Sequence, residues 1–193
     1  CVSSSGASKR RFCAEHAVAH DRCGKLVVAT SAEEVSRLGL LAEKAQANGV
    51  AITHLTSESA HEYEPHVVSV AAFHVAATGR ADFAGVAAAL ARRVVANGGE
   101  IRTKVRAGRA TPIAAGWEIT TDQEPVVAKF LVGCAGLHSD RVAQASGEKP
   151  DTRILPFRGE YLDVTGPSAN LVKGLVYPVP DPRFPFLGVH LTR

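Results

Sequence analysis

Methionine is absent from this 193-residue sequence, and aromatic residues make up only 6% of it. A complete translated chain starts with methionine, so we expect the sequence to be a segment of a longer protein or a processed product. Long apolar runs are also missing. The run GVAAALA at residues 85–91 is among the longest, and it falls well short of the ~20 residues that a helix needs to cross a bilayer. The sequence therefore predicts no membrane-spanning helix.

A strong charge of one sign is missing as well. The formal net charge is +3, and the basic residues are scattered except for the short run SKRR at residues 8–11. Because a nucleic-acid-binding surface gathers its basic residues on one face, we expect no nucleic-acid partner. Cysteine is also sparse, with four residues, which is too few for a disulfide scaffold. This scarcity favours a reducing compartment, and we expect the cytoplasm.

Three of the cysteines are Cys1, Cys23 and Cys134, and the fourth, Cys13, raises the question of a metal site. The run CAEHAVAHDRC spaces Cys13, His16, His20 and Cys23 as C-x2-H-x3-H-x2-C. These residue types can bind zinc. Structural zinc sites usually divide their ligands between two separate turns, however, and here all four lie in one short run. We expect a helix end followed by a loop into a strand, and no metal.

Apolar periodicity and capping residues predict a mixed α/β fold. Two helices are well marked, one after Ser31 with Glu34 in the capping-box spacing, and one after Asp82 with Phe83, Val86, Leu90 and Val94 as its apolar stripe. From Asp151 onward the sequence pattern predicts mainly strands, interrupted by prolines. The expected strands are 25–30, 51–55, 70–76, 100–105, an antiparallel ribbon over 109–135, and parts of 153–166 and 174–193.

The stretch KFLVGCAGLHSD at residues 129–140 has the pattern of half a nucleotide site. An apolar run over 130–132 predicts a strand, which leads into the small residues 133–136 and then a helix from Ser139. Such a turn is where α/β proteins bring backbone N–H groups close to a ligand. The sequence has neither G-x-G-x-x-G nor G-x-x-x-x-G-K-[ST], so the other half of such a site is not found in it.

Several motifs resemble those of the L-2-hydroxyglutarate oxidase and dehydrogenase family. The most specific are LPFRGEYL at 155–162 and YPVPDPRFPFLGVHLT at 177–192. They are joined, in order, by CGKLVVAT, EPHV, TGRADF and CAGLHSDRVA, and the resemblance runs from about Phe12 to Arg193. This family consists of FAD enzymes of the D-amino-acid-oxidase-like superfamily. Its pattern also includes an N-terminal G-x-G-x-x-G and a C-terminal segment, neither of which occurs in this sequence.

The resemblance implies a partial FAD-binding Rossmann-like domain with a substrate domain built on a mixed or antiparallel sheet. We expect residues 1–80 and 151–193 to belong to the substrate domain and residues 81–150 to the FAD-binding domain. By the same resemblance, Cys134, Ala135 and Gly136 contact FAD. The backbone of Val105 would meet the adenine. From the residues alone, the small side chains of the 134–136 turn could equally serve helix–strand packing.

The implied substrate is a 2-hydroxy dicarboxylate, L-2-hydroxyglutarate, oxidised to 2-oxoglutarate by hydride transfer to the flavin. Its two carboxylates require cations, and arginine binds a carboxylate through two parallel hydrogen bonds. We expect Arg158 to bind one carboxylate, although a salt bridge with Glu160 is the structural alternative. Lys25 is a second candidate cation, unless it is simply solvated. Arg183 is a third, unless it only braces its loop through Asp181.

His190 is the candidate general base that takes the hydroxyl proton, because imidazole titrates near neutral pH. A histidine with a purely structural role is the alternative. Tyr161 and Tyr177 could donate hydrogen bonds to the substrate or to neighbouring backbone instead. No role is assigned to His54, His61, His66, His74 or His138.

Two other functions remain open. The chain could be a truncated, non-catalytic module, or part of another flavoprotein of the superfamily that acts on an amino acid or glycerol phosphate. The motif at 177–192 argues against the second. The resemblance leaves the electron acceptor open between oxygen, a quinone and another carrier, and it allows peripheral membrane association of the complete enzyme.

Overall fold

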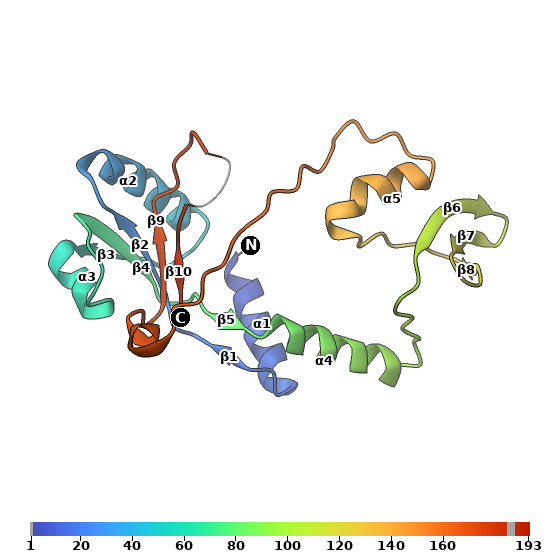
Figure 1. Cartoon of the computed structure of the whole chain (residues 1–193), viewed down its shortest axis with the longest axis horizontal. Helices are drawn as coiled ribbons and strands as arrows, with labels where there is room; N and C mark the ends of the chain where they lie inside the picture. The colour runs from blue at the N-terminus through green and yellow to red at the C-terminus, as the bar shows by residue number, and fades with distance from the viewer. Residues whose placement is uncertain (1, 185–187) are drawn as a thin grey trace. The chain divides into compact units, whose positions relative to one another are not determined.

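The computed structural model describes residues 2–184 and 188–193. The chain divides into two compact units, which we describe separately (Figure 1). The first unit comprises Cys1–Asn97 and Asp163–Arg193, and the second comprises Gly98–Leu162. These boundaries differ from the predicted ones at 80/81 and 150/151, because the helix after Asp82 packs in the first unit. Residues 185–187 of the 177–192 motif lie outside the described residues.

A five-stranded mixed sheet with strand order β10-β9-β2-β4-β3 forms the first unit. Strand β2 lies at its centre, antiparallel to β4 and parallel to β9. Four of the five β2 residues are buried, as expected for a central strand covered on both faces. The strands are β2 (Lys25–Ala29), β3 (Thr53–Thr56), β4 (Ala71–Val75), β9 (Leu175–Pro178) and β10 (Leu191–Thr192).

Helix α2 (Ala32–Ala47) covers one face of this sheet. Its buried residues Leu38 and Ala42 pack in one cluster with alternate residues of the strands, among them Val27 and Phe73. The predicted N-cap is confirmed, because the Ser31 side chain accepts a hydrogen bond from the Glu34 backbone N–H. Val35, in the first turn of the helix, is exposed.

Helix α3 (Ser57–Tyr63) covers the other face. Its Ala60 is fully buried and packs in the cluster that holds Leu26 and Val176. A reciprocal capping box between Thr56 and Ser59 satisfies the backbone at the start of the helix. Glu64 is the C-cap residue that follows the helix. A 3₁₀ turn, η2 (Gly166–Asn170), precedes β9.

A smaller core joins α1 (Val2–Glu15) to α4 (Phe83–Ala96), beside the short pair β1 (His20–Asp21) and β5 (Arg80–Ala81). It is formed by Cys13, Val18 and Ala89. The predicted stripe of α4 is largely incorrect, because three of its four residues are exposed and Phe83 is 77% exposed. The small Ala89 makes the buried contact instead, where a larger side chain would hold the elements apart.

The second unit contains the antiparallel ribbon that the sequence predicted. Its strands pair in the order β6-β7-β8, with a register shift in β6. The helix after Ser139 also forms, preceded by a 3₁₀ turn. The elements are β6 (Ala107–Ile113), β7 (Gly116–Thr121), β8 (Val126–Ala128), η1 (Gly136–His138) and α5 (Ser139–Ala145).

Three predicted strands are wrong. Residues 100–105, 130–132 and 153–165 are extended or irregular and pair with no strand among the described residues. Apolar content favours an extended backbone, but a strand forms only where a neighbour satisfies its N–H and C=O groups. Among the described residues, no helix combines the length and apolar character needed to cross a membrane.

Candidate functional site

Three predicted site residues from distant parts of the sequence come together in the first unit: Lys25, Tyr177 and His190. Lys25 opens β2, and Tyr177 lies on the adjacent β9. His190 immediately precedes β10, which pairs antiparallel with β9. The Lys25 Nζ lies 5.2 Å from the centroid of the Tyr177 ring, and the Tyr177 and His190 rings are 4.8 Å apart between centroids. We name this group the Lys25–Tyr177–His190 cluster.

The cluster combines a cation, which can bind a carboxylate, with an imidazole, which can accept the proton of a hydroxyl group. Lys25 is half-buried, and this burial lowers the pKa of its ammonium. The Tyr177 ring lies within cation–π distance of that ammonium. The His190 Nδ1 is 3.2 Å from the Gly188 carbonyl oxygen. When Nδ1 carries the ring proton it donates to that carbonyl, and Nε2 then keeps its lone pair free to accept a proton.

A cavity of about 40 Å³ adjoins Lys25, which is space enough for a water molecule. Its lining includes Tyr63, Glu64, His74 and Gly174. The Tyr63 and His74 rings are 4.4 Å apart, and burial lowers the pKa of His74. The sequence alone predicted no role for His74 or Glu64. The EPHV motif was the available signal for Glu64, but its contacts are with residues more than 100 positions away.

Arg183 is engaged by a carboxylate of its own loop. Its guanidinium makes a bidentate contact with Asp181, with Nη2 2.6 Å from Oδ2. Asp181 also lies 3.6 Å from Nη1 of Arg37 in α2. Its hydrogen bonds with Arg183 lower the pKa of Asp181 to about 2. The structure therefore shows the loop-bracing contact that was the alternative for Arg183, while its role toward a substrate remains a prediction.

Arg158 and Tyr161 lie in the extended part of the second unit. The Arg158 side chain is 86% exposed, and Tyr161 as a whole residue is 88% exposed. An Arg158 nitrogen is 3.5 Å from a Glu160 carboxylate oxygen, the contact foreseen as the structural alternative. Such an exposed ion pair contributes little to stability. Their roles as substrate ligands remain predictions.

The predicted cofactor residues of the second unit form an open turn. Gly136 has φ +55°, a left-handed conformation that favours glycine, and begins η1. A Cβ added at Gly133 or Gly136 would meet no heavy atom within 4 Å, and Cys134 is exposed. There is therefore open space beside Gly133 and Gly136, and the turn fits a cofactor that approaches the main chain closely at these two residues. Val105 is half-buried, one residue after Lys104, whose φ is +58°.

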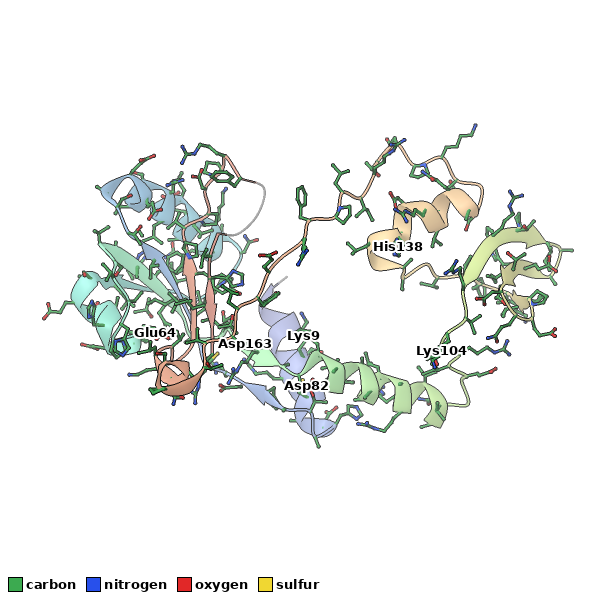
Figure 2. The ribbon with its side chains drawn as sticks, in the orientation of Figure 1. Lys9, Glu64, Asp82, Lys104, His138 and Asp163 are labelled. Carbon is green, nitrogen blue, oxygen red and sulfur yellow. The ribbon has the colours of Figure 1, made fainter. Side chains whose placement is uncertain are left out.

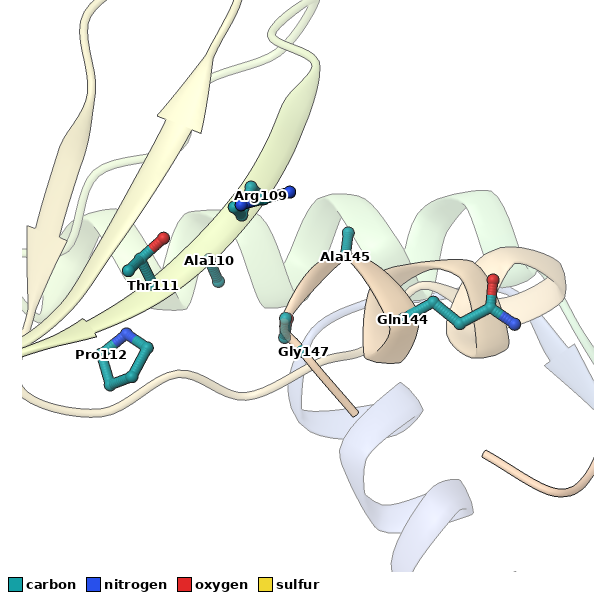
Figure 3. Close-up of a pocket in the computed structure, with 8 residues that line it drawn as sticks. Arg109, Ala110, Thr111, Pro112, Gln144, Ala145 and Gly147 are labelled. Carbon is teal, nitrogen blue, oxygen red and sulfur yellow. The ribbon is translucent and has the colours of Figure 1, made fainter. Parts of the chain in front are cut away.

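A larger hollow of about 260 Å³ lies between β6 and the end of α5 (Figure 3). Arg109, Thr111 and Pro112 line one side, and residues 144–147 line the other. Its lining contains none of the predicted site residues. The zinc alternative also gains no support, because the described residues contain no group of three or more His, Cys, Asp or Glu side chains placed to hold a metal. Cys13 instead packs in the core between α1 and α4.

Known proteins are similar to this chain in both sequence and fold. The profile of the family described as FAD dependent oxidoreductase matches residues 2–193. A protein from Salmonella houtenae named L-2-hydroxyglutarate dehydrogenase is 39% identical over 194 residues, which cover 100% of this chain and 46% of that relative. The mitochondrial L-2-hydroxyglutarate dehydrogenase of Homo sapiens is 38% identical, with 94% of this chain and 42% of the relative covered. The chain thus spans about half the length of the curated relatives it matches.

Solved structures show the same fold at low sequence identity. Glycine oxidase from Geobacillus kaustophilus matches 91% of this chain and 49% of its own length, with a TM-score of 0.75 and 19% identity. L-proline dehydrogenase from P. horikoshii matches 91% of this chain and 48% of its own length, with a TM-score of 0.73 and 16% identity. At these identities the likeness concerns the fold alone.

Proposed function

Because the chain belongs to the family of FAD-dependent oxidoreductases, we propose that the protein containing it oxidises L-2-hydroxyglutarate to 2-oxoglutarate with FAD as the cofactor. The family is the one that the motifs predicted. The observation that carries the proposal is the Lys25–Tyr177–His190 cluster, in which the Tyr177 ring contacts both the Lys25 ammonium and the His190 ring. Relatives that are 36% to 40% identical to the chain are named L-2-hydroxyglutarate dehydrogenase, which supports the choice of substrate.

Each residue of the cluster has a role in this reaction. The Lys25 ammonium binds a substrate carboxylate through a charge-assisted contact. His190 accepts the proton of the substrate hydroxyl at Nε2, and the C–O bond becomes a carbonyl as the α-carbon loses its hydride. FAD, when bound, supplies the acceptor for that hydride. Tyr177, in contact with both partners, holds Lys25 and His190 at a fixed separation.

The second unit contributes the cofactor contact in this proposal. The 134–136 turn exposes backbone to a bound FAD, and small residues allow that approach. Arg158 binds the second substrate carboxylate, and Tyr161 hydrogen-bonds to the substrate. We place the enzyme in the cytoplasm, where the complete protein could also bind peripherally to a membrane surface. The electron acceptor in this proposal is oxygen, a quinone or another carrier.

The test uses the protein expressed from its complete reading frame. The purified flavoprotein is mixed anaerobically with L-2-hydroxyglutarate, and bleaching of the flavin absorbance is followed. We expect L-2-hydroxyglutarate to reduce the flavin at least ten times faster than its D enantiomer, glycine or glycerol 3-phosphate. Faster reduction by glycine or by glycerol 3-phosphate would assign the protein to another branch of the superfamily. A protein that carries no flavin would support the non-catalytic module instead.

A further inference from the structure

Glu64 is a buried carboxylate that no step of the proposed reaction uses. It lies at the end of α3 (Figure 2) and is only 5% exposed. Its Oε1 accepts a hydrogen bond from the Gly174 backbone N–H at 2.6 Å, and the Lys173 N–H lies 3.2 Å from Oε1 and 3.0 Å from Oε2. A buried charge is costly unless hydrogen bonds compensate it, and here two consecutive backbone donors do so.

The donors belong to the segment that leads directly into β9. Gly174 immediately precedes Leu175, which pairs with Lys25 in the parallel register of β9 and β2. A Cβ added at Gly174 would lie 2.9 Å from the Cys23 carbonyl oxygen and 3.4 Å from Glu64 Oε1. The start of β9 is therefore confined between Glu64 on one side and the backbone before Lys25 on the other.

Glu64 itself is held firmly. Its backbone N–H donates to the Ala60 carbonyl, and Ala60 is fully buried against the same core cluster as Val176 of β9. The capping box of Thr56 and Ser59 fixes the other end of the helix. Through these contacts, the position of α3 fixes the backbone three and four residues before Tyr177.

We propose that Glu64 is a positioning residue for the oxidation: its contacts with the Lys173 and Gly174 N–H groups set the placement of β9, and so hold Tyr177 between Lys25 and His190. This inference rests on the proposed function. A displacement of about 1 Å in a reacting constellation is enough to slow a reaction by roughly 100-fold. Glu64 does not touch the substrate in this account, so its effect passes entirely through the cluster.

The test replaces Glu64 by glutamine in the complete flavoprotein. The amide oxygen can still accept from Gly174, but the NH2 group replaces the oxygen that makes the shorter contact with Lys173 and then faces the Lys173 N–H, a second donor. We expect the limiting rate of anaerobic flavin reduction, measured per bound flavin, to fall by roughly 10- to 100-fold. The matched control is Glu62→Gln on the same helix, where the exposed side chain should leave the rate unchanged.

A double-mutant cycle separates positioning from stability. If Glu64 acts through the cluster, Glu64→Gln should change the rate by less than about threefold in a His190→Gln background, because interacting residues are non-additive. Additive effects would overturn the inference, as would a wild-type rate per flavin in Glu64→Gln. If Glu64→Gln retains no flavin, Gly174→Ala is measured in its place, because an added methyl group crowds the same contact. Loss of folded protein in both variants would show that Glu64 serves stability alone. A wild-type flavoprotein that L-2-hydroxyglutarate does not reduce would instead contradict the proposed function.

Discussion

At His190, the hydrogen bond of one ring nitrogen decides what the other can do. Nδ1 lies against the Gly188 carbonyl, so the tautomer that donates there leaves Nε2 as the acceptor. The ring is also packed against Tyr177, which limits its rotation. A general base needs both a free lone pair and a fixed direction, and these contacts supply them.

Replacing His190 by glutamine should therefore remove the base while keeping a similar bulk and a hydrogen-bonding end. We expect the rate of flavin reduction by L-2-hydroxyglutarate to fall by roughly 10²- to 10⁴-fold, the usual share of a general base. Anaerobic stopped-flow measurement of flavin reduction provides the test. A variant that reduces its flavin at the wild-type rate would place the base elsewhere.

Lys25 should produce an alkaline decline in the pH profile of kcat/KM. Burial lowers its pKa below the ordinary value of 10.5, so the ammonium loses its proton at a lower pH than an exposed lysine would. Binding of the substrate carboxylate is then complete below that pKa and is lost as the pH rises through it. We expect kcat/KM, which reports the free enzyme, to decline on the alkaline side below pH 10.5.

The control for this limb is Lys25→Arg. A guanidinium stays protonated throughout the accessible range, so the alkaline decline in kcat/KM should vanish even if the overall value is reduced by the altered shape. A decline that persists unchanged in Lys25→Arg would show that another group titrates there.

At the scale of elements, the turn that leads into β2 determines where Lys25 begins its strand. Gly24 has φ +75°, and its N–H donates to the Thr78 carbonyl. A Cβ at Gly24 would overlap the His74 ring. The backbone conformation and the space beside it both require glycine at this position.

The pair Gly24→Ala and Gly49→Ala separates these two requirements. Gly49 ends α2 with φ +71°, and an added Cβ there meets nothing within 4 Å. Gly49→Ala should therefore lower the free energy of unfolding by about 1–2 kcal/mol, the cost of a left-handed alanine. Gly24→Ala should cost distinctly more, because the His74 ring must also move. Urea unfolding of both variants measures the difference, and equal losses would show that His74 yields freely.

At the scale of the whole molecule, the chain contains a five-stranded mixed sheet in the first unit and the predicted cofactor turn in the second. The first unit buries both faces of β2, through α2 and α3. In the second unit the 130–137 region exposes large apolar side chains, including Phe130 and Val132. In the proposed function, the turn at 134–136 would give FAD one backbone contact, whereas a G-x-G-x-x-G helix terminus would supply the favourable electrostatics for its pyrophosphate.

We therefore expect residues 1–193, expressed alone, not to retain FAD. Without a helix N-terminus that points at the pyrophosphate, the negative charge has no strong partner. The purified chain should be colourless after gel filtration under native conditions, while the protein from the complete reading frame should be yellow. A stoichiometric flavin spectrum in the isolated chain would show that the open turn suffices.

The sequence by itself determined the features that depend on short spacings. The Ser31 cap of α2, the apolar run of β2, the antiparallel ribbon and the family motifs are all local patterns, and the structure contains the predicted elements. These features are predictable because capping and periodicity act within a few residues. The same locality explains the errors at 100–105 and 130–132, where an extended pattern found no pairing strand among the described residues.

Only the tertiary structure decided which of the candidate residues meet. Lys25 and Tyr177 lie close because β2 and β9 pair in parallel, and Glu64 reaches Gly174 across 110 positions of the chain. Register and long-range pairing depend on the packing of both sheet faces at once, so no local spacing encodes them. The sequence thus identified the chemical groups, and the folding of α3 and β9 onto β2 brought Lys25, Tyr177 and His190 into one cluster.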